Sequence, residues 1–431
     1  MSRLFLSLAL LAASLFACGP VESPERLPQS LVLAMAVLGE NEDGSPKPLP
    51  ARAGILTREG GEWRYRFFED EDSNVFHKVM PYGTEGLLTL GGSKAAVKLW
   101  RPDGKTETLW EADFGGKFSR MRDSEVADLY GDGGASIAVA THDQGVVAVL
   151  RPEPGSAGGF AAVELDREPD TFVHEVEVGD LDGDGTLEVY ATPSEPNRLD
   201  GTPQSGKVVR YVPKRGEGRV VVADLGERHA KEILVEDLDG DGRDELYVSV
   251  EGTTAADGKT LVDPVEIRVY QAGTPATGGV RIATLPDRLS RFLTAGDVDG
   301  DGRKELVAAA FSSGVWLLRP GSQSGEGKRP EGPELPWSSA RSEPEASGVP
   351  GEWEVELVDP DSAGFEHAAI LADLDGDGVD ELYVASDRHK ELRRYVWRSG
   401  RPVRETIYRR PDLRPIFTWN LMPVPVELIP R

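Results

Sequence analysis

The stretch Val178–Val189 reads VGDLDGDGTLEV, with an aspartate at every second position of its centre and a glutamate soon after. Close copies recur as VEDLDGDGRDEL (Val235–Leu246), AGDVDGDGRKEL (Ala295–Leu306) and LADLDGDGVDEL (Leu371–Leu382). Alternating carboxylates on a tightly turned backbone can converge on one point, and glycine permits the positive φ that such a turn needs. Because hard oxygen ligands suit a hard cation, each copy predicts a Ca²⁺-binding loop.

Each loop offers carboxylates at its positions 1, 3, 5 and 9 and a backbone carbonyl at position 7. The expected carboxylate ligands are Asp180, Asp182, Asp184, Glu188, Asp237, Asp239, Asp241, Glu245, Asp297, Asp299, Asp301, Glu305, Asp373, Asp375, Asp377 and Glu381, and the carbonyls are those of Thr186, Arg243, Arg303 and Val379. A decayed copy, VADLYGDGGASIAVA, keeps Asp128 and Asp132 as candidate ligands of a weaker site. We expect about four Ca²⁺ ions, in loops that are poorly ordered when empty because their carboxylates repel one another.

Two other interpretations of these loops fit less well. An EF-hand begins with the same D-x-D-x-D-G pattern but places a bidentate glutamate at position 12, between two helices. The residues at position 12 are Ala191, Val248, Ala308 and Val384. None is acidic, and the flanking segments HEVEVGD and LEVYAT alternate and are rich in β-branched residues, as strands are. A plain hairpin turn with solvated acids would not need the same four acids in four copies.

The spacing of the loops predicts a repeated four-stranded unit. Their first aspartates stand at 180, 237, 297 and 373, with intervals of 57, 60 and 76 residues, and the decayed copy begins 52 residues earlier. Repeats of this kind with four strands each are typical of propeller blades. A metal-free unit over 74–113 and three N-terminal strands bring the count to seven blades.

The predicted fold is therefore all-β, a seven-bladed β-propeller of four-stranded antiparallel blades. We expect the C-terminal segment PIFTWNLM (Pro415–Met422) to enter the first blade as its innermost strand. Closing the ring in this way removes the exposed sheet edges that an open array would present. The propeller is expected over 31–425, with a Pro- and Gly-rich flexible insertion at 320–352.

The N-terminus has the character of an export signal. Arg3 precedes the apolar run Leu4–Ala17, which is too short to span a bilayer, and together they predict a signal peptide over 1–17. The run ends in Leu-Phe-Ala-Cys, which resembles the bacterial lipobox, and Cys18 is the only cysteine of the chain. A lipidated tether over 18–30 would anchor the protein without a transmembrane helix. Gly19 after the cysteine indicates the outer membrane; a plain secretory signal followed by a free thiol is the alternative.

The D-x-D-G-D-G-x-x-E loops between strands resemble the FG-GAP and VCBS repeats of integrin α-subunit propellers and of many bacterial surface proteins. The resemblance implies structural calcium ions on the face formed by the turns between strands 1 and 2. It also implies that ligands bind the opposite face, formed by the connections between strands 4 and 1 and between strands 2 and 3. Five of the seven expected blades carry the loop, one of them in decayed form, whereas the first two depart from the pattern.

A basic residue recurs six positions before the first residue of the loop, and in the metal-free blade one stands six positions before Gly83. The residues concerned are His77, Arg122, His174, Lys231, Arg291 and His367. The first strands line the centre of a propeller, so a ring of cations there could hold an anion such as a carboxylate, a uronate or an acidic side chain of a partner. Alternatively each cation pairs with a neighbouring carboxylate, since Asp123, Glu175 and Glu232 follow directly.

The charge and the motifs limit the function. A formal net charge of −26 argues against nucleic acid as a partner, because phosphate binding requires clustered Lys and Arg. No G-x-S-x-G or H-E-x-x-H motif occurs, and the six histidines define no triad. We therefore expect a protein that is not an enzyme but a calcium-stabilised binding or scaffold module for a protein or acidic polysaccharide at the cell envelope. The alternative is a calcium-dependent polysaccharide lyase, with a Lys or His as base, or another carbohydrate-active enzyme.

Overall fold

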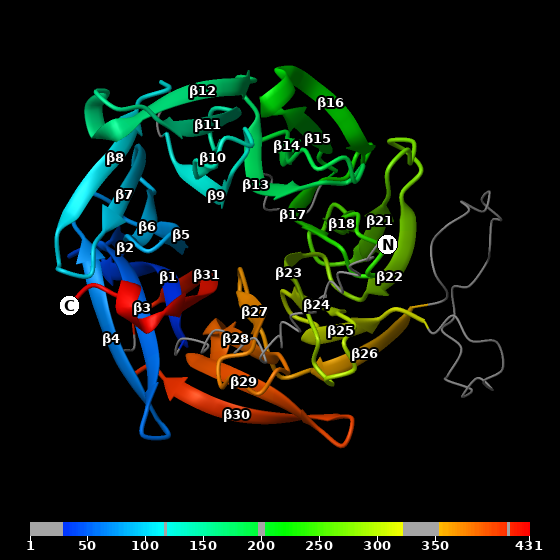
Figure 1. Cartoon of the computed structure of the whole chain (residues 1–431). Coiled ribbons are helices and arrows are strands. Elements are labelled where there is room, and N and C mark those ends of the chain that lie inside the picture. The colour runs from blue at the N-terminus through cyan, green and yellow to red at the C-terminus, as the bar shows by residue number, and fades with distance from the viewer. Residues whose placement is uncertain (1–28, 116–118, 197–202, 322–352, 412–413) are drawn as a thin grey trace, which may run out of the picture.

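The computed structural model describes residues 29–115, 119–196, 203–321, 353–411 and 414–431. These residues form seven antiparallel blades arranged in a ring, as Figure 1 shows. The described helical segments are four 3-10 turns: η1 (Ala157–Gly159), η2 (Pro213–Arg215), η3 (Asp387–His389) and η4 (Val426–Leu428). The predicted all-β, seven-bladed propeller is thus confirmed. The expected signal peptide, Cys18, most of the tether and nearly all of the insertion lie outside the described residues.

Blade 1 is closed by the C-terminal strand, as the sequence predicts. β31 (Ile416–Pro425) pairs antiparallel with β1 (Gln29–Glu40), in a register that runs from Gln29 opposite Pro425 to Val37 opposite Ile416. On its other side β1 pairs with β3 (Ala51–Glu59), which pairs with β4 (Glu62–Asp70), and the short β2 (Pro46–Pro48) pairs with the end of β1. The first blade therefore joins the two ends of the described chain.

The other six blades each take their four strands from one continuous part of the chain. Blade 2 consists of β5 (Phe76–Tyr82), β6 (Gly86–Gly91), β7 (Ala95–Trp100) and β8 (Thr106–Ala112). Blade 3 consists of β9 (Met121–Ala127), β10 (Ser136–Thr141), β11 (Val146–Pro152) and β12 (Phe160–Arg167). Blade 4 consists of β13 (Phe172–Gly179), β14 (Glu188–Ser194), β15 (Lys207–Val212) and β16 (Glu217–Asp224).

Blade 5 consists of β17 (Ala230–Glu236), β18 (Glu245–Val250), β21 (Val265–Tyr270) and β22 (Val280–Leu285). Blade 6 consists of β23 (Ser290–Gly296), β24 (Glu305–Ala310), β25 (Val315–Arg319) and β26 (Glu354–Asp359). Blade 7 consists of β27 (Ala369–Ala372), β28 (Glu381–Ser386), β29 (Glu391–Arg398) and β30 (Arg401–Arg409). A small hairpin of β19 (Thr253–Thr254) and β20 (Leu261–Asp263) lies in the connection from β18 to β21. The expected insertion joins β25 to β26.

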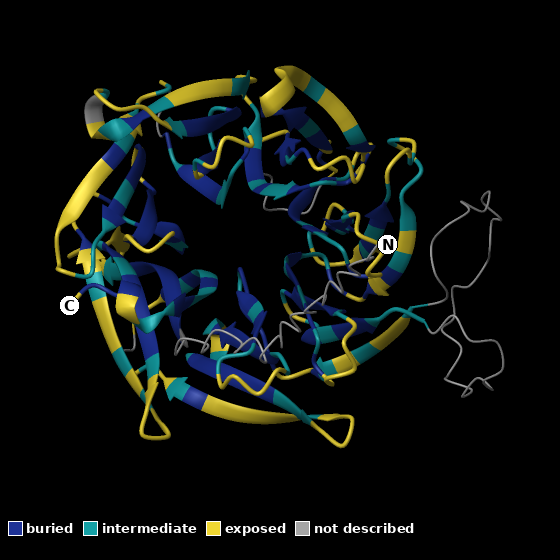
Figure 2. Cartoon of the chain, in the orientation of Figure 1, coloured by how far each residue is buried: buried dark blue, intermediate teal, exposed yellow. Residues whose placement is uncertain are grey.

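Apolar side chains of the inner strands pack each blade against the next. Leu90 and Val97 of blade 2, for example, share one buried cluster with Ile137 and Val139 of blade 3. The fourth strands, by contrast, form the rim and are largely exposed, as Figure 2 shows for β8, β12 and β16. Burial of apolar surface between blades therefore holds the ring together.

The up-and-down strand order gives the ring two different faces. The turns from strand 1 to strand 2 and from strand 3 to strand 4 emerge on one face, which carries the predicted calcium loops and is called the metal-loop face below. The turns from strand 2 to strand 3 and the connections from strand 4 to the next blade emerge on the other face, called the crossover face.

A β-bulge recurs on the first strand of blades 2 to 6. In blade 5, for example, the register passes from Ala230 opposite Val250 to Glu232 opposite Ser249, which leaves Lys231 as the extra residue. Equivalent shifts occur at the same point of β5, β9, β13 and β23. Because a bulge interrupts the regular alternation of side chains and re-aims the residue at that point, it sets the direction of the recurring basic residue.

Candidate functional site

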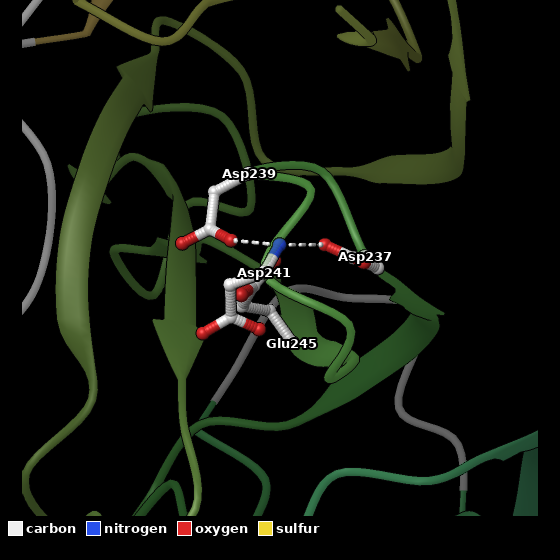
Figure 3. A group of neighbouring side chains, drawn as sticks. All are labelled: Asp237, Asp239, Asp241 and Glu245. Atoms are coloured by element: carbon white, nitrogen blue, oxygen red, sulfur yellow. Dashed lines mark hydrogen bonds between the residues drawn. The ribbon is translucent and has the colours of Figure 1, made fainter. Parts of the chain in front are cut away.

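The predicted calcium loops bring their acids together. In blade 5, one oxygen from each of Asp237, Asp239, Asp241 and Glu245 lies within 4.8 Å of the others (Figure 3). Three acids meet the same criterion in each of the other blades concerned: Asp180, Asp182 and Asp184 in blade 4, Asp297, Asp299 and Glu305 in blade 6, and Asp373, Asp375 and Asp377 in blade 7. Glu188, Asp301 and Glu381 are not part of these groups. The predicted carbonyl donors Thr186, Arg243, Arg303 and Val379 stand two residues before β14, β18, β24 and β28.

Backbone hydrogen bonds fix the first aspartate of each loop. In blade 5 the N–H of Gly240 donates to Asp237 Oδ1 at 2.7 Å, and the N–H of Gly242 donates to Oδ2 at 2.9 Å. Gly240 and Gly242 have φ of 75° and 88°, a conformation that glycine adopts without strain. The N–H of Asp241 also donates to Asp237 and Asp239 (Figure 3). These hydrogen bonds thus hold the carboxylates of the loop close to one another.

The donor set in blades 5 and 6 fits a divalent cation. Burial, with the neighbouring charge of Asp239, raises the pKa of Glu245 to about 7, and burial with Asp299 raises that of Glu305 to about 7. These two glutamates are therefore only partly ionised at neutral pH, and a positive charge beside them would favour the ionised form. A hard cation bound among three or four carboxylate oxygens would supply that charge.

Blades 4 and 7 differ from blades 5 and 6, because the glutamate of the loop forms an ion pair with an arginine. Arg210 Nη1 lies 2.7 Å from Glu188 Oε1, and Arg394 contacts Glu381 and lies 2.6 Å from Asp375 Oδ2. The glutamate therefore faces a guanidinium, which explains why neither Glu188 nor Glu381 joins the group of converging acids.

These arginines were not predicted, although the strand register identifies them. Arg210 stands opposite Tyr190 and Arg394 stands opposite Tyr383. The same position on the third strand is Val269 in blade 5 and Leu317 in blade 6. The signal is thus one residue on a neighbouring strand, visible only once the strands are aligned.

The decayed loop of blade 3 keeps the backbone geometry but fewer acids. Asp128 accepts the N–H groups of Asp132 and Gly133 at 3.0 and 2.8 Å, as the first aspartate does in the full loops. Asp132 Oδ2 lies 2.9 Å from Arg151 Nη2. Two carboxylates, one already paired, form a poorer cation site than the other loops.

The six recurring basic residues are all buried, with between 0 and 9% of each exposed. Three of them join a network with two buried glutamates. Glu366 lies 3.3 Å from Arg122 and 2.5 Å from Arg291, and Glu251 lies 3.3 Å from Arg291 and 3.7 Å from Lys231. The cations are therefore paired, but with Glu251 and Glu366 and not with the residues that follow them in the sequence.

Two of the three histidines of the set contact backbone carbonyls. His77 Nδ1 lies 2.5 Å from the carbonyl of Met121, and His367 Nδ1 lies 2.6 Å from that of Ala310. Burial lowers the pKa of His367 to about 4 and lowers those of His77 and His174 well below their usual value. These side chains are neutral at physiological pH, so the ring has fewer cations than its sequence suggests.

The acids that follow the basic residues surround a single lysine. Lys78 Nζ lies 3.0 Å from Asp123 Oδ1 and also contacts Glu125. Burial, with the charge of Asp123, raises the pKa of Glu175 well above its usual value, and burial with Glu125 does the same for Glu177. A layer of carboxylates thus lies next to the layer of basic residues along the axis.

A cavity of about 370 Å³ opens on the crossover face, between blades 6 and 7 and the start of β31. Three phenylalanines and four cationic residues contribute to its wall: Phe311, Phe365, Phe417, Arg388, Lys390, Arg410 and Arg414. Asp387 is the one acid of this wall. On a chain of strongly negative net charge, this is a locally basic and aromatic site.

None of the described helical segments is long and apolar enough to cross a membrane.

Comparisons with known proteins identify the fold. No family model matches the chain, and no curated protein matches it. A candidate 6-phosphogluconolactonase from Bacteroides fragilis superposes with a TM-score of 0.50 at 12% identity, over 93% of this chain and 99% of that chain. The Dos1 propeller gives 0.50 at 9% identity, over 88% of this chain and 85% of that one. The periplasmic gluconolactonase of Pseudomonas aeruginosa gives 0.47 at 14% identity, over 90 and 99%.

The expectation that the protein is not an enzyme needs correction. It was based on missing linear motifs, yet a solved structure of similar shape is described as a 6-phosphogluconolactonase, which is an enzyme. A propeller builds a site from loops of several blades, so its reactive groups are dispersed along the chain and need form no linear motif. At such low identity these structures share the fold with this chain, and they assign it no reaction.

Proposed function

We propose that this protein is a calcium-stabilised β-propeller, anchored in a bacterial outer membrane through lipidated Cys18, that binds a ligand of the cell envelope on its crossover face. The observation that carries the proposal is the separation of two kinds of site. Converging carboxylates occupy the metal-loop face, whereas the basic and aromatic cavity lies on the crossover face.

Calcium has a structural role in this proposal. The loops of blades 5 and 6 would hold the ion through Asp237, Asp239, Asp241 and Glu245 and through Asp297, Asp299 and Glu305. Bound calcium would neutralise acids that otherwise repel one another, and so stabilise the turn between the two innermost strands of each blade. The ions would thereby stiffen the ring at the end where no ligand binds.

The ligand side of the proposal is based on shape and charge. The crossover face carries the described cavity, and its wall has four cationic residues and one acid. Sites of this kind, concave and mainly apolar with a few charged groups, are typical of ligand-binding regions. An acidic polysaccharide or the acidic surface of a protein would complement it.

Two measurements test the function. Purified protein with Arg388→Ala, on the crossover face, is compared with Arg398→Ala, an exposed arginine of the same blade on the metal-loop face. Binding to polygalacturonate and to envelope proteins should fall with the first variant and stay unchanged with the second. The same samples are assayed for unsaturated uronate, which distinguishes binding from cleavage. Equal binding by both variants would refute a ligand site on the crossover face.

Fractionation tests the anchor. Wild-type protein should sediment with membranes and enter detergent, whereas Cys18→Ser should be released or remain uncleaved. Wild-type protein found wholly in the soluble fraction would contradict lipidation.

A further inference from the structure

We infer that the cavity on the crossover face binds a carboxylate carried on a six-membered ring, either a uronate sugar or an aromatic acid. The inference rests on the proposed function and specifies its ligand. The volume of the cavity, about 370 Å³, suits one or two such rings. It lies at the small end of the usual range for ligand pockets.

Three aromatic rings from distant parts of the chain form the apolar wall. Phe311 follows β24, Phe365 precedes β27, and Phe417 lies on β31. The ring centroids of Phe311 and Phe365 are 6.4 Å apart, and those of Phe365 and Phe417 are 6.1 Å apart, both pairs edge to face. All three side chains are partly exposed. They can therefore cover the face of a ring that enters the cavity.

The cationic wall is built around Arg410. The side chain of Arg410 is 10% exposed, and its Nη2 lies 3.0 Å from Asp387 Oδ1. Asp387 also accepts the N–H and the hydroxyl of Thr418, at 2.7 and 2.9 Å. The one acid of the wall is thus fully engaged with its own neighbours. It leaves an excess of positive charge in the cavity.

Arg388 is the side chain best placed to bind the ligand. It follows Asp387 in η3, and its side chain is exposed at the wall of the cavity. Among the residues that the structure describes, its guanidinium has no ion-pair partner. A guanidinium binds a carboxylate through two parallel hydrogen bonds, which selects a carboxylate over a neutral hydroxyl.

The cavity also touches the central network of charges. Arg291 stacks on Phe365, with its guanidinium carbon 4.5 Å from the ring centroid. Arg291 also contacts Glu366, the residue that follows Phe365. Phe365 is therefore held in place by a buried cation. A rigid wall of this kind reduces the entropy that ligand binding costs.

Calorimetric titration with four probes tests the inference: galacturonate, benzoate, neutral galactose and inorganic phosphate. We expect galacturonate or benzoate to bind more tightly than galactose and phosphate. Arg388→Ala should lower the affinity for the probe that binds about tenfold or more, because a charge-assisted hydrogen bond is lost. Arg398→Ala should leave affinity unchanged.

The outcomes separate the two ligand sources. Binding of galacturonate alone identifies a sugar acid, and binding of benzoate alone identifies an aromatic acid. Failure of both to bind, equal binding of galactose or phosphate, or an unchanged affinity in Arg388→Ala would overturn the inference. A protein that captures its partner on the crossover face but binds neither ring acid would refute this inference and leave the proposed function standing.

Discussion

Arg122 of blade 3 contacts Glu366 at the start of blade 7, with 3.3 Å between Nη2 and Oε2, although the two blades are not neighbours in the ring. The other oxygen of Glu366 lies 2.5 Å from Arg291 of blade 6. One carboxylate therefore connects first strands from separate parts of the ring. Charge pairing at the centre adds to the packing between adjacent blades.

Removing the charge of Glu366 should destabilise the protein strongly. Glu366→Gln preserves the shape but leaves the buried guanidinium groups of Arg122 and Arg291 short of a counter-charge. Breaking a buried ion pair in this way costs about 3–5 kcal/mol. The midpoint of urea unfolding measures the effect. As a control, Glu62→Gln removes an ion pair whose glutamate is 71% exposed, and should cost no more than about 1 kcal/mol.

Removal of calcium should lower the melting temperature. Ions that bind the folded loops and not the unfolded chain stabilise the folded state by mass action. Calcium should restore the melting temperature far better than magnesium, which prefers an octahedral and partly hydrated site. Calorimetric melts with and without EDTA measure this, and superimposable curves would contradict it. Asp239→Ala should reduce the number of bound ions by about one.

The third strand should decide how tightly each loop binds calcium. Arg394→Val gives blade 7 the residue that blade 5 has at Val269, and frees Glu381 and Asp375 for the ion. We expect the calcium affinity of that loop to rise about tenfold, because the ion no longer competes with a guanidinium for these two carboxylates. The reverse change, Val269→Arg, should weaken the loop of blade 5. Calcium titrations of both variants check the pair, and identical isotherms would show that the arginine has no such role.

The acids beside Lys78 should make stability depend on pH. The pKa of Glu177 lies well above its usual 4.5 in the folded protein, because of burial and the nearby Glu125. A carboxyl with a raised folded-state pKa favours folding below its unfolded value and loses that contribution as pH rises through the folded value.

Glu177→Gln should therefore raise the melting temperature at pH 8 and change it little at pH 5. Buried histidines such as His174, whose pKa is lowered, act in the opposite direction as pH falls. Parent and variant are compared at each pH so that this contribution cancels. A variant that shifts the melting temperature equally at both pH values would show that the pKa of Glu177 is not raised in the folded protein.

The repeats were enough to predict the architecture, because each copy carries its own turn and strand signals. Seven blades, the strand that closes the ring and the convergence of acids such as Asp237 and Asp239 all follow from local patterns. The partners of Arg122 and Lys78 could not be predicted in this way. Asp123 contacts Lys78 of the neighbouring blade, whereas Arg122 contacts Glu366 of blade 7, and neither contact joins residues that are close in the sequence.

The cavity could not be predicted from the sequence either. Phe311, Phe365, Arg388 and Phe417 belong to four separate segments, each of which looks like an ordinary loop or strand end. Only the ring geometry of blades 6, 7 and 1 brings them together. The arginines at the loops of blades 4 and 7 were missed for a similar reason, since they lie on neighbouring strands.

The pairing of β31 with β1 also constrains the order of events during biosynthesis. Until the segment Ile416–Pro425 has emerged and crossed to its destination, blade 1 lacks its inner strand and β1 keeps an unpaired edge. An edge of that kind is a template for pairing with another molecule. A chain cut short before Ile416 would therefore tend to aggregate or be degraded, which makes completion of the ring a checkpoint on full-length synthesis.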